Sequence, residues 1–320
     1  MDLLIVGSIG YDDIETVSAS GSDILGGSAV HAGVSASFHL PKLPSEEPRV
    51  ALIAPIGEDF SDNDAKSLER AGLNFTGVSK LPGKTFRWSG KYEGDMDIVT
   101  TISTELNVLG DFEPVIPDGW NSPRVLFCAN THPSSQISVL DQCPNAGLSA
   151  IDTFMLWIET EFELLSAAIR KADIAILNEE EACAISGEGL FTHSFDPIMS
   201  GSALHGGEIS GRGPRGMIVK RGSSGVMAKF PCGTIVLPAY PTDDIVDPTG
   251  CGDSFAGAFL SNMVDVQTSI NDLEATRLAM INAIVTSSFT IGGLGSSKLQ
   301  SLERGTYHAR MDKYRRMVGL

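Results

Sequence analysis

A short segment toward the C-terminal end of the chain carries the residue types that phosphoryl transfer needs. Its sequence is Asp247-Pro-Thr-Gly-Cys-Gly-Asp253, and the stretch that follows, Ser254–Leu260, predicts a helix. Glycines let the backbone turn tightly and bring its N–H groups close to a ligand. The start of a helix favours an anion because its N–H groups are unpaired and its dipole is positive there. A carboxylate at Asp253 would take the proton of an attacking hydroxyl, beside dipoles that stabilise the transferred group.

A plainer interpretation of this segment is an aspartate that caps a helix after a glycine-rich turn, which is common. A cap needs only one residue, whereas two glycines and two aspartates stand here at fixed spacing. We therefore favour the functional interpretation.

Two other segments match phosphate-binding motifs only in part. Gly83-Lys84-Thr85 lacks the earlier glycine of a P-loop, since Val78 stands there, and it leads into a predicted strand. Residues 211–216 fit G-x-G-x-x-G literally but precede a predicted strand, whereas the dinucleotide motif follows a strand and opens a helix. The chain also lacks H-E-x-x-H and G-x-S-x-G. These patterns give no support for zinc chemistry or nucleophilic hydrolysis.

Continuous apolar runs predict the buried strands that must position the motif. Helical periodicity over Phe60–Ala71 and Trp157–Ala172 lies between several of these runs. The alternation of strands and helices predicts an α/β fold, with a mostly parallel central sheet and helices on both faces. The predicted strands are Leu3–Val6, Val50–Pro55, Val125–Ala129, Leu148–Ile151, Ile174–Leu177 and Met217–Lys220.

One region departs from this pattern. Residues 85–104 alternate large and polar side chains around Gly94-Asp95, which predicts antiparallel strands, and residues 11–25 are also strand-like and polar. We expect the two segments to pair into a small sheet beside the main one. The prediction is a single domain over residues 1–320 with a β lid formed from about 11–25 and 85–104. The exposed lid strands are a candidate homodimer surface, and residues 200–216 predict a surface loop.

Composition narrows the classes of partner. The chain has 320 residues, of which 42% are hydrophobic and 20% charged, as in soluble globular proteins. Lys+Arg 23 and Asp+Glu 40 give a net charge of −17, which repels phosphate backbones and anionic lipid. We therefore expect no nucleic-acid or membrane partner. Five widely spaced cysteines and an N-terminus without a positive charge favour reduced thiols and a cytoplasmic location.

The motif and four further segments resemble the ribokinase-like (PfkB) carbohydrate kinases. The family signature D-T-x-G-A-G-D is matched with Pro248 and Cys251 as the two departures. The resemblance covers nearly the whole chain, because all five segments stand in the family's order. It implies a ribokinase-like three-layer sandwich and an ATP-dependent kinase that uses Mg²⁺. The other four segments are 6–12 (VGSIGYD), 26–29 (GGSA), 178–181 (NEEE) and 220–225 (KRGSSG).

The resemblance also implies roles for particular residues. Asp253 would be the general base, and the backbone N–H groups of Gly250, Cys251 and Gly252 would form an anion hole. The nucleotide-binding candidates are Asn178, Glu181, Lys220, Gly222, Gly225 and Asn282. The resemblance points to Asp12, Gly27, Ser28 and His31 as substrate-binding candidates. Arg87 of the predicted lid, which could hold hydroxyls or a phosphate, and Asn130 and Thr131 at a strand end are added from the residues themselves. A monovalent cation, usually potassium in the family, would be held by Asp247, Thr249, Ser288, Ile291, Gly293 and Ser297.

Several of these residues have structural alternatives. Asn178 and Glu181 could be a helix cap with solvated acids, and Asp12 could be a turn residue beside Asp13. His31 stands where sugar kinases of the family often have Asn, and it could simply pack or cap a helix. Asn130 and Thr131 are candidates because they follow a predicted strand, at the edge where open α/β sheets bind ligands.

The substrate is the least determined feature. The predicted lid contains Phe86, Trp88 and Tyr92, whose rings could stack on a sugar or on a nucleobase, or could form the packed face of the lid sheet. The main hypothesis is a kinase for a hydroxyl of a sugar or sugar-like alcohol. The alternatives are a nucleoside kinase and a catalytically silent binding protein. Binding alone would not require Asp253, which argues against the last of these.

Overall fold

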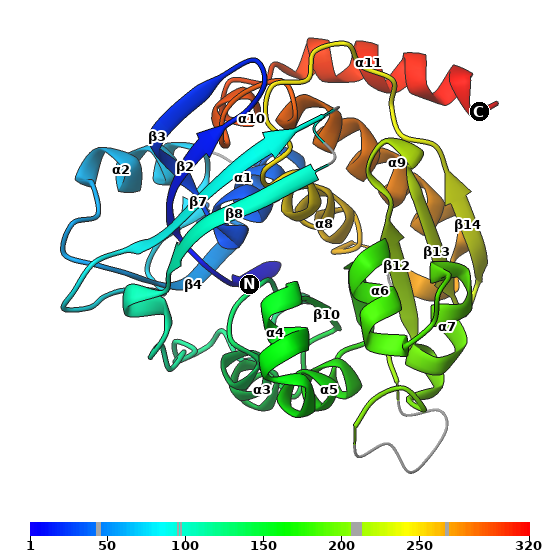
Figure 1. The fold of residues 1–320 in the computed structure, drawn as a ribbon, viewed down its shortest axis with the longest axis horizontal. Helices are drawn as coiled ribbons and strands as arrows, with labels where there is room; N and C mark the ends of the chain where they lie inside the picture. The colour runs from blue at the N-terminus through cyan, green and yellow to red at the C-terminus, as the bar shows by residue number, and fades with distance from the viewer. Residues whose placement is uncertain (43–45, 95, 97, 206–212, 266–268) are drawn as a thin grey trace.

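The computed structural model describes residues 1–320 except 43–45, 95, 97, 206–212 and 266–268 (Figure 1). Its main sheet confirms the predicted α/β class. In chain order the strands of this sheet are β1 (Leu3–Val6), β4 (Val50–Ile56), β5 (Leu73–Asn74), β6 (Val78–Lys80), β9 (Val125–Cys128), β10 (Leu148–Asp152), β11 (Ile174–Asn178), β12 (Gly216–Lys220), β13 (Val226–Phe230) and β14 (Gly233–Leu237).

The strands lie side by side in the order β14-β13-β12-β11-β10-β9-β1-β4-β5, with β6 paired to β4. All pairs are parallel except those that β13 makes with β12 and β14. In the sheet, β4 lies on one side of β1 and β9 lies on the other side, followed by β10. The order of the strands therefore reverses direction at β1. Ligands of open α/β sheets bind at such a reversal, beyond the carboxyl ends of the strands.

Helices cover both faces of this sheet (Figure 1). One face is covered by α1 (Ser28–His39), α8 (Cys251–Ser261), α9 (Leu273–Thr290) and α11 (Arg304–Met317). The other is covered by α3 (Pro133–Gln142), α5 (Phe162–Lys171), α6 (Glu179–Ser186) and α7 (Phe191–Ser200). The shorter helices are α2 (Asp62–Arg70), α4 (Met155–Thr160) and α10 (Ser297–Gln300), with 3₁₀ turns at Asn107–Leu109, Gly222–Ser224 and Ser269–Asn271.

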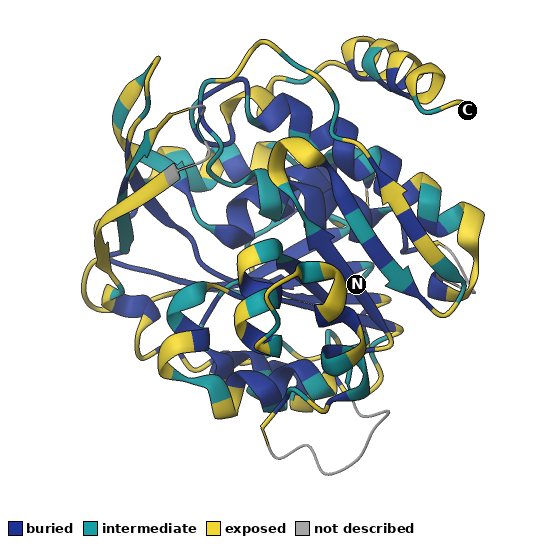
Figure 2. Cartoon of the chain, turned by 45° about the vertical axis from the view of Figure 1, so that its right-hand side comes forward, coloured by how far each residue is buried: buried dark blue, intermediate teal, exposed yellow. Residues whose placement is uncertain are grey.

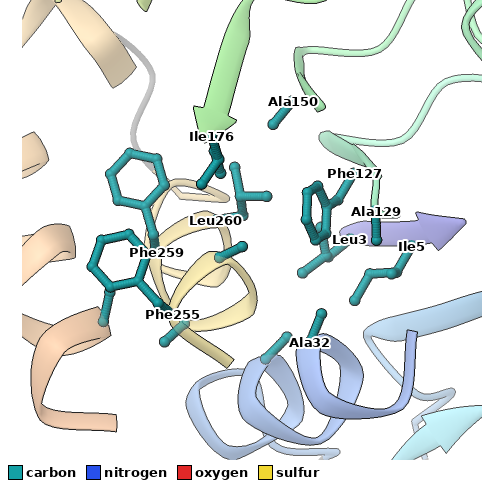
Figure 3. Packing of buried hydrophobic residues seen from close by; sticks show 14 of the residues in the cluster. Leu3, Ile5, Ala32, Phe127, Ala129, Ala150, Ile176, Phe255, Phe259 and Leu260 are labelled. Carbon is teal, nitrogen blue, oxygen red and sulfur yellow. The ribbon is translucent and has the colours of Figure 1, made fainter. Parts of the chain in front are cut away.

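Alternation along each strand divides the core into two clusters, one on each face of the sheet. In β1, Leu3 and Ile5 pack on the side of α1 and α8, whereas Leu4 and Val6 pack on the side of α3 and α5. Figure 3 shows Leu3, Ile5 and Phe127 beside the α8 residues of the first cluster. Because each strand is apolar on both faces, it appears as a continuous apolar run in the sequence. Figure 2 shows the result, with buried strands between partly exposed helices.

A second, four-stranded sheet lies beside the main one, and we call it the small sheet. It consists of β2 (Gly10–Glu15), β3 (Ser20–Gly26), β7 (Phe86–Glu93) and β8 (Ile98–Glu105), in the order β3-β2-β7-β8. The two predicted strand segments therefore pair as expected, with β2 parallel to β7. Asp95, in the predicted turn between β7 and β8, lies outside the described residues.

The structure also bears on a predicted helix, on a segment that resembles a P-loop and on a predicted loop. The predicted helix 157–172 is two helices, α4 and α5, because Glu161 leaves the helical conformation (φ −133°, ψ 33°). Lys84-Thr85 leads into β7, as expected for a segment that is not a P-loop. Residues 206–212 of the predicted loop 200–216 lie outside the described residues. Within the described part of the chain, no helix is long and apolar enough to span a membrane.

Candidate active site

A cavity of about 220 Å³ lies at the carboxyl ends of β1 and β9, where the strand order reverses. The small sheet, the segment after β9 and the start of α8 all contribute to its lining. Asp253 is part of this lining. The motif carboxylate therefore reaches a cavity instead of turning into the apolar core.

Helix α8 begins at Cys251, and Gly250 precedes it with φ 72°. A Cβ on Gly250 would lie 2.2 Å from the His31 ring, so both the backbone conformation and the neighbouring ring require glycine there. A Cβ on Gly252 would come within 3.0 Å of Lys220 Nζ. The absence of these side chains brings the backbone of the turn close to a lysine ammonium and to the cavity.

Two of the three expected anion-hole amides are free. The N–H groups of Gly250 and Gly252 have no acceptor among the described residues. The N–H of Cys251 donates instead to the Pro248 carbonyl at 3.1 Å, which closes the turn. The Cys251 thiol lies 3.9 Å from the Ser287 carbonyl of α9. Cys251 therefore holds the turn in place, and the amides of its two glycine neighbours remain for a ligand.

Asp253 belongs to a cluster of ionisable side chains. Lys220 Nζ lies 2.9 Å from Asp152 Oδ2, and both charges act on Asp253. Burial raises the pKa of Asp253, the Asp152 charge raises it further, and Lys220 opposes them. A carboxylate with a raised pKa is a stronger base than an exposed aspartate.

Asp152 is a site residue that the sequence analysis missed. It is the last residue of β10, and β10 lies beside β11, which ends at Asn178. The next strand, β12, ends at Lys220. A carboxylate directly after a predicted strand was therefore the available signal, since the carboxyl ends of parallel strands meet at one edge of a sheet.

Asn178 and Glu181 form a helix cap, as the structural alternative proposed. Asn178 Oδ1 accepts from the Glu181 N–H and Glu181 Oε2 accepts from the Asn178 N–H, both at 2.8 Å. Glu181 is nevertheless buried, with 4% of its surface exposed, so the expected solvated acid is wrong. Burial raises the pKa of Glu181, the Asp152 charge raises it further, and Lys220 lowers it. The capped helix start therefore faces the Asp152–Lys220 pair.

These residues fit a nucleotide that carries magnesium. Lys220 and the free amides of Gly250 and Gly252 offer positive groups for phosphate oxygens. Among the described residues, no three His, Cys, Asp or Glu side chains converge to hold a metal ion. Mg²⁺ on a nucleotide takes most of its ligands from phosphates and water, with one or two carboxylates. Asp152 and Glu181 supply carboxylates of this kind beside Lys220.

Asp12 and Asp13 are separated by the alternation of β2. Asp12 is 3% exposed and lines the cavity, whereas Asp13 faces the other side and accepts from the Asp23 N–H at 2.9 Å. The Asp12 carboxylate has no hydrogen-bond donor among the described residues. Burial, with the charges of Asp247 and Asp253, raises the pKa of Asp12 to about 8. A buried acceptor without a partner suits a ligand that brings hydroxyl donors.

The double-glycine turn opens α1 as predicted. Gly27 has φ 98°, and a Cβ there would lie 2.5 Å from the Ser8 carbonyl. Ser28 Oγ donates to the Asn130 carbonyl at 2.9 Å and so links α1 to the segment after β9. The buried His31 ring lines the cavity with both nitrogens unpartnered, and burial lowers its pKa to about 4. A neutral imidazole here can donate one hydrogen bond and accept another.

Asn130 and Thr131 also line the cavity. Asn130 Oδ1 accepts from Trp157 Nε1 at 2.9 Å, which leaves the Asn130 amide group for a ligand. Thr131 Oγ1 is buried and has no partner among the described residues. Both residues stand where the position of the preceding strand predicted them.

Arg87 does not line the cavity, so this structure gives its assignment as a substrate-binding residue no support. Its guanidinium contacts Asp23 at 2.5 Å and Asp59 at 3.6 Å. Side chains alternate along a strand, and the cavity side of β7 is taken by Phe86 and Trp88. Arg87 therefore lies on the opposite face.

The remaining nucleotide-binding candidates differ in position. Gly225 has φ 92°, and a Cβ there would lie 2.1 Å from the Leu237 carbonyl, so its role in the fold is a close backbone approach. Gly222 has φ 52° and open space around its Cα. Asn282 is not available to a ligand: its amide donates to Asn262 and Leu278, and its oxygen accepts from Tyr307 at 2.6 Å. The assignment of Asn282 to nucleotide binding therefore has no support in this structure, because its polar side-chain atoms are engaged within the helical layer.

The six expected cation ligands do not offer a free cage. The two Asp247 oxygens accept from the N–H groups of Thr249 and Gly295. The Ile291 carbonyl accepts from the N–H groups of Val246 and Asp247, at 2.8 and 3.0 Å. Ser297 Oγ donates to the Leu294 carbonyl. The Ser288 carbonyl accepts from the Arg310 guanidinium. Of the proposed set, the Asp247, Thr249 and Gly293 carbonyls make no hydrogen bond within the described chain. The oxygens of Ser288, Ile291 and Ser297 are already engaged, so the set does not form a complete cage for a potassium ion.

The Asp152 charge has a measurable consequence. Because this charge raises the pKa of Asp253, Asp152→Asn should lower it. We expect the acidic limb of the kcat/KM profile to move to lower pH by about one unit. Initial rates across the acidic range check this, with Glu180→Gln, an exposed acid at the start of α6, as the control. An unmoved limb, or one shifted to higher pH, would contradict the assigned coupling.

The chain is similar in sequence and in fold to known kinases. Residues 47–276 match the sequence model of the pfkB family carbohydrate kinases. A cytidine kinase of Thermococcus kodakarensis is 28% identical over 272 residues, which cover 82% of this chain and 88% of the relative. The fold is similar to that of a nucleoside kinase of Methanocaldococcus jannaschii, with a TM-score of 0.71, 18% identity and coverage of 98% and 99%. It is also similar to a putative ribokinase II of E. coli in complex with ATP and Mg²⁺, with a TM-score of 0.73, 18% identity and coverage of 97% and 99%. The predicted ribokinase-like fold is thereby confirmed, and the chain belongs to the pfkB family of carbohydrate kinases, phosphotransferases that act on an alcohol group.

Proposed function

We propose that this chain is an ATP-dependent nucleoside kinase, which transfers the γ-phosphoryl group of MgATP to a hydroxyl of the nucleoside sugar. The observation that carries the proposal is the lining of the cavity. Aromatic rings from two parts of the chain line it: Phe86, Trp88 and Tyr92 from the small sheet, and Phe154 and Trp157 from the segment after β10. Such rings suit a flat base, because stacking on aromatic faces holds any base by its π surface.

The polar end of the cavity suits the sugar of a nucleoside. Asp12 offers an unpartnered carboxylate, and Asn130 offers its amide group. His31 and Thr131 add polar atoms that have no partner within the described chain. Buried polar groups of this kind favour a ligand with several hydroxyls, since each unmade hydrogen bond is costly. The aromatic and polar ends together match a base joined to a sugar better than a sugar alone.

The proposed chemistry takes place at the start of α8. MgATP supplies the phosphoryl group, and Lys220 with the amides of Gly250 and Gly252 holds negative oxygens there. Asp253 accepts the proton of the attacking hydroxyl. The neighbouring Asp152 raises the proton affinity of Asp253 and holds the Lys220 ammonium at 2.9 Å.

The small sheet would act as the lid. Tyr92 Oη lies 3.1 Å from Thr249 Oγ1, so β7 already touches the motif segment. The Trp88 ring lies over Gly90, where a Cβ would fall 2.0 Å from it. A lid in this position would exclude water from the transferred phosphoryl group and prevent hydrolysis of ATP. Dimerisation through this sheet remains a prediction, consistent with exposed Val99 and Ile102 on the edge strand β8.

A substrate screen tests the proposal. Purified protein is incubated with MgATP and with pyrimidine nucleosides, purine nucleosides, ribose, deoxyribose or fructose, and ADP release is measured. We expect turnover with at least one nucleoside and a kcat/KM for it at least tenfold above that for any free sugar. A free sugar as the best substrate would instead support the sugar-kinase hypothesis. Nucleotide binding without turnover on any acceptor would support a silent binding protein.

Trp88 and Arg87 form a matched pair for testing the base-stacking side, because they lie on opposite faces of β7. Trp88→Ala should raise the KM for the nucleoside about tenfold or more, the usual effect of losing one stacked ring. Arg87→Ala should leave it nearly unchanged, since its guanidinium contacts Asp23 and Asp59. Steady-state kinetics on both variants check this. Equal effects of the two substitutions would contradict the assigned stacking face.

A further inference from the structure

We propose that Arg310 performs in this chain the task for which the family's monovalent cation would be needed: its guanidinium neutralises the carbonyl end of α9 and holds the turn that carries the anion hole. Arg310 lies on α11, outside every motif of the sequence analysis. Its Nη1 donates to the Ser288 carbonyl at 2.7 Å and to Ser288 Oγ at 3.1 Å. Ser288 was one of the six expected cation ligands.

The C-terminal end of α9 needs a cation. The last carbonyls of a helix have no partner within it, and the helix dipole is negative there. The Ser287 and Phe289 carbonyls accept from the N–H groups of Ile291 and Gly292, but neither of these reaches the Ser288 carbonyl. Within the described chain, the Arg310 guanidinium is the donor to that carbonyl. Arg310 thus acts as the cap of this helix end.

Two aromatic rings hold the Arg310 guanidinium in place. Its central carbon lies 3.6 Å from the centre of the Phe289 ring and 5.0 Å from that of Tyr240. A cation over aromatic faces is favoured when it is partly removed from water. The Asp244 charge also acts on it from the wall of the same cavity, beyond ion-pair distance. Its direct contacts are the Ser288 oxygens and the two rings.

This helix end is joined directly to the anion hole. The Cys251 thiol, at the start of α8, lies 3.9 Å from the Ser287 carbonyl. The Ile291 carbonyl, just after α9, accepts from the Asp247 N–H at 3.0 Å, and Asp247 Oδ1 accepts from the Thr249 N–H at 2.8 Å. A displaced α9 end would therefore shift the turn at Gly250. Arg310 is a positioning residue, which acts on the phosphoryl site through these contacts.

The first consequence concerns the wild-type protein. Its turnover should be the same within about twofold in potassium chloride and in tetramethylammonium chloride at equal ionic strength, because the cationic group is already part of the chain. Its melting temperature without substrate should also be the same in the two salts. Activation of the wild type by potassium of fivefold or more would overturn the proposal.

Removing the guanidinium should create a cation requirement. In tetramethylammonium chloride, Arg310→Ala should lose turnover about tenfold, the usual effect of deleting a charged hydrogen bond, and its melting temperature should fall. A cavity of about 350 Å³ opens on Arg310, so a small cation can enter the vacated space. Millimolar guanidinium or potassium should restore most of the turnover and raise the melting temperature.

Two variants separate this role from general destabilisation. Arg310→Lys keeps a positive charge and should retain turnover in tetramethylammonium chloride, and Arg315→Ala, an exposed arginine of the same helix, should behave as the wild type. Failure of Arg310→Lys, or absence of any cation rescue in Arg310→Ala, would overturn the proposal. The inference rests on the proposed anion hole. The melting-temperature measurements need no substrate, however, so they test cation replacement even if no nucleoside is phosphorylated.

Discussion

Asp253→Asn should lower kcat by roughly 10²–10⁴, the usual contribution of a general base, while nucleotide affinity stays nearly unchanged. Asparagine has the same shape as aspartate but cannot accept the hydroxyl proton. The free amides of Gly250 and Gly252 and the Lys220 ammonium remain in place, so the phosphate-binding groups are intact. The loss should therefore fall on the chemical step and not on the KM for ATP.

Three measurements decide this prediction. Steady-state rates with the best acceptor from the screen give kcat, calorimetry gives the affinity for MgATP, and thermal unfolding shows whether the variant is folded. Glu180→Gln, an exposed acid in the first turn of α6, is the control for a lost charge near the site. A folded Asp253→Asn variant with wild-type kcat would refute the role of Asp253.

Asp12→Asn should weaken catalysis and stabilise the fold at the same time. The Asp12 carboxylate lines the cavity and has no donor among the described residues, so it is available for the hydroxyls of the substrate. Losing one of its two oxygen partners should leave a substrate hydroxyl mispaired and lower kcat/KM roughly 10- to 100-fold. Burying an ionisable carboxyl without a partner is unfavourable for folding, so its replacement by a neutral amide should raise the melting temperature of the substrate-free protein.

The pH dependence of stability separates these two effects of Asp12. Its pKa is about 8 in the folded chain against an ordinary value of 3.8, so the folded state binds the proton more tightly than the unfolded state. Its contribution to stability is complete below the ordinary value and is lost as pH rises toward 8. The unfolding free energy of the wild type should therefore fall over this range more than that of Asp12→Asn. Asp13→Asn, on the exposed face of β2, is the matched control, and identical pH profiles for all three proteins would contradict the assignment.

The features predicted correctly from the sequence depend on local pattern. Strands such as Leu3–Val6 are apolar on both faces because helices cover both sides of the sheet, so each is visible as an uninterrupted run. The start of α8 was predicted because Gly250 and Gly252 change the backbone itself, and Asp253 follows within one turn. Asp12 lies in β2 and Asn130 follows β9, and the sequence pattern predicted strands at both places.

The features that were missed depend on register and on distant packing. A shift of one residue in the register of β7 would exchange the faces of Arg87 and Trp88. Both side chains are large, so the sequence alone does not determine which of them faces the cavity. Asn282 and Arg310 have partners on other helices, 25 and 22 residues away respectively. No local pattern records such contacts. The break at Glu161 has neither glycine nor proline nearby, so the two helices around it appear as one amphipathic stretch.

In the proposed mechanism, Asp253 and the amides at the start of α8 act together on one phosphoryl group. The most direct measurement is a crystal structure of the protein with ADP, magnesium, aluminium fluoride and the preferred nucleoside. We predict that the fluoride ligands lie about 3 Å from the amides of Gly250 and Gly252, with the acceptor hydroxyl within hydrogen-bond reach of Asp253. An aluminium fluoride group bound elsewhere, with the nucleoside hydroxyl out of reach of the Asp253 carboxylate, would contradict the account.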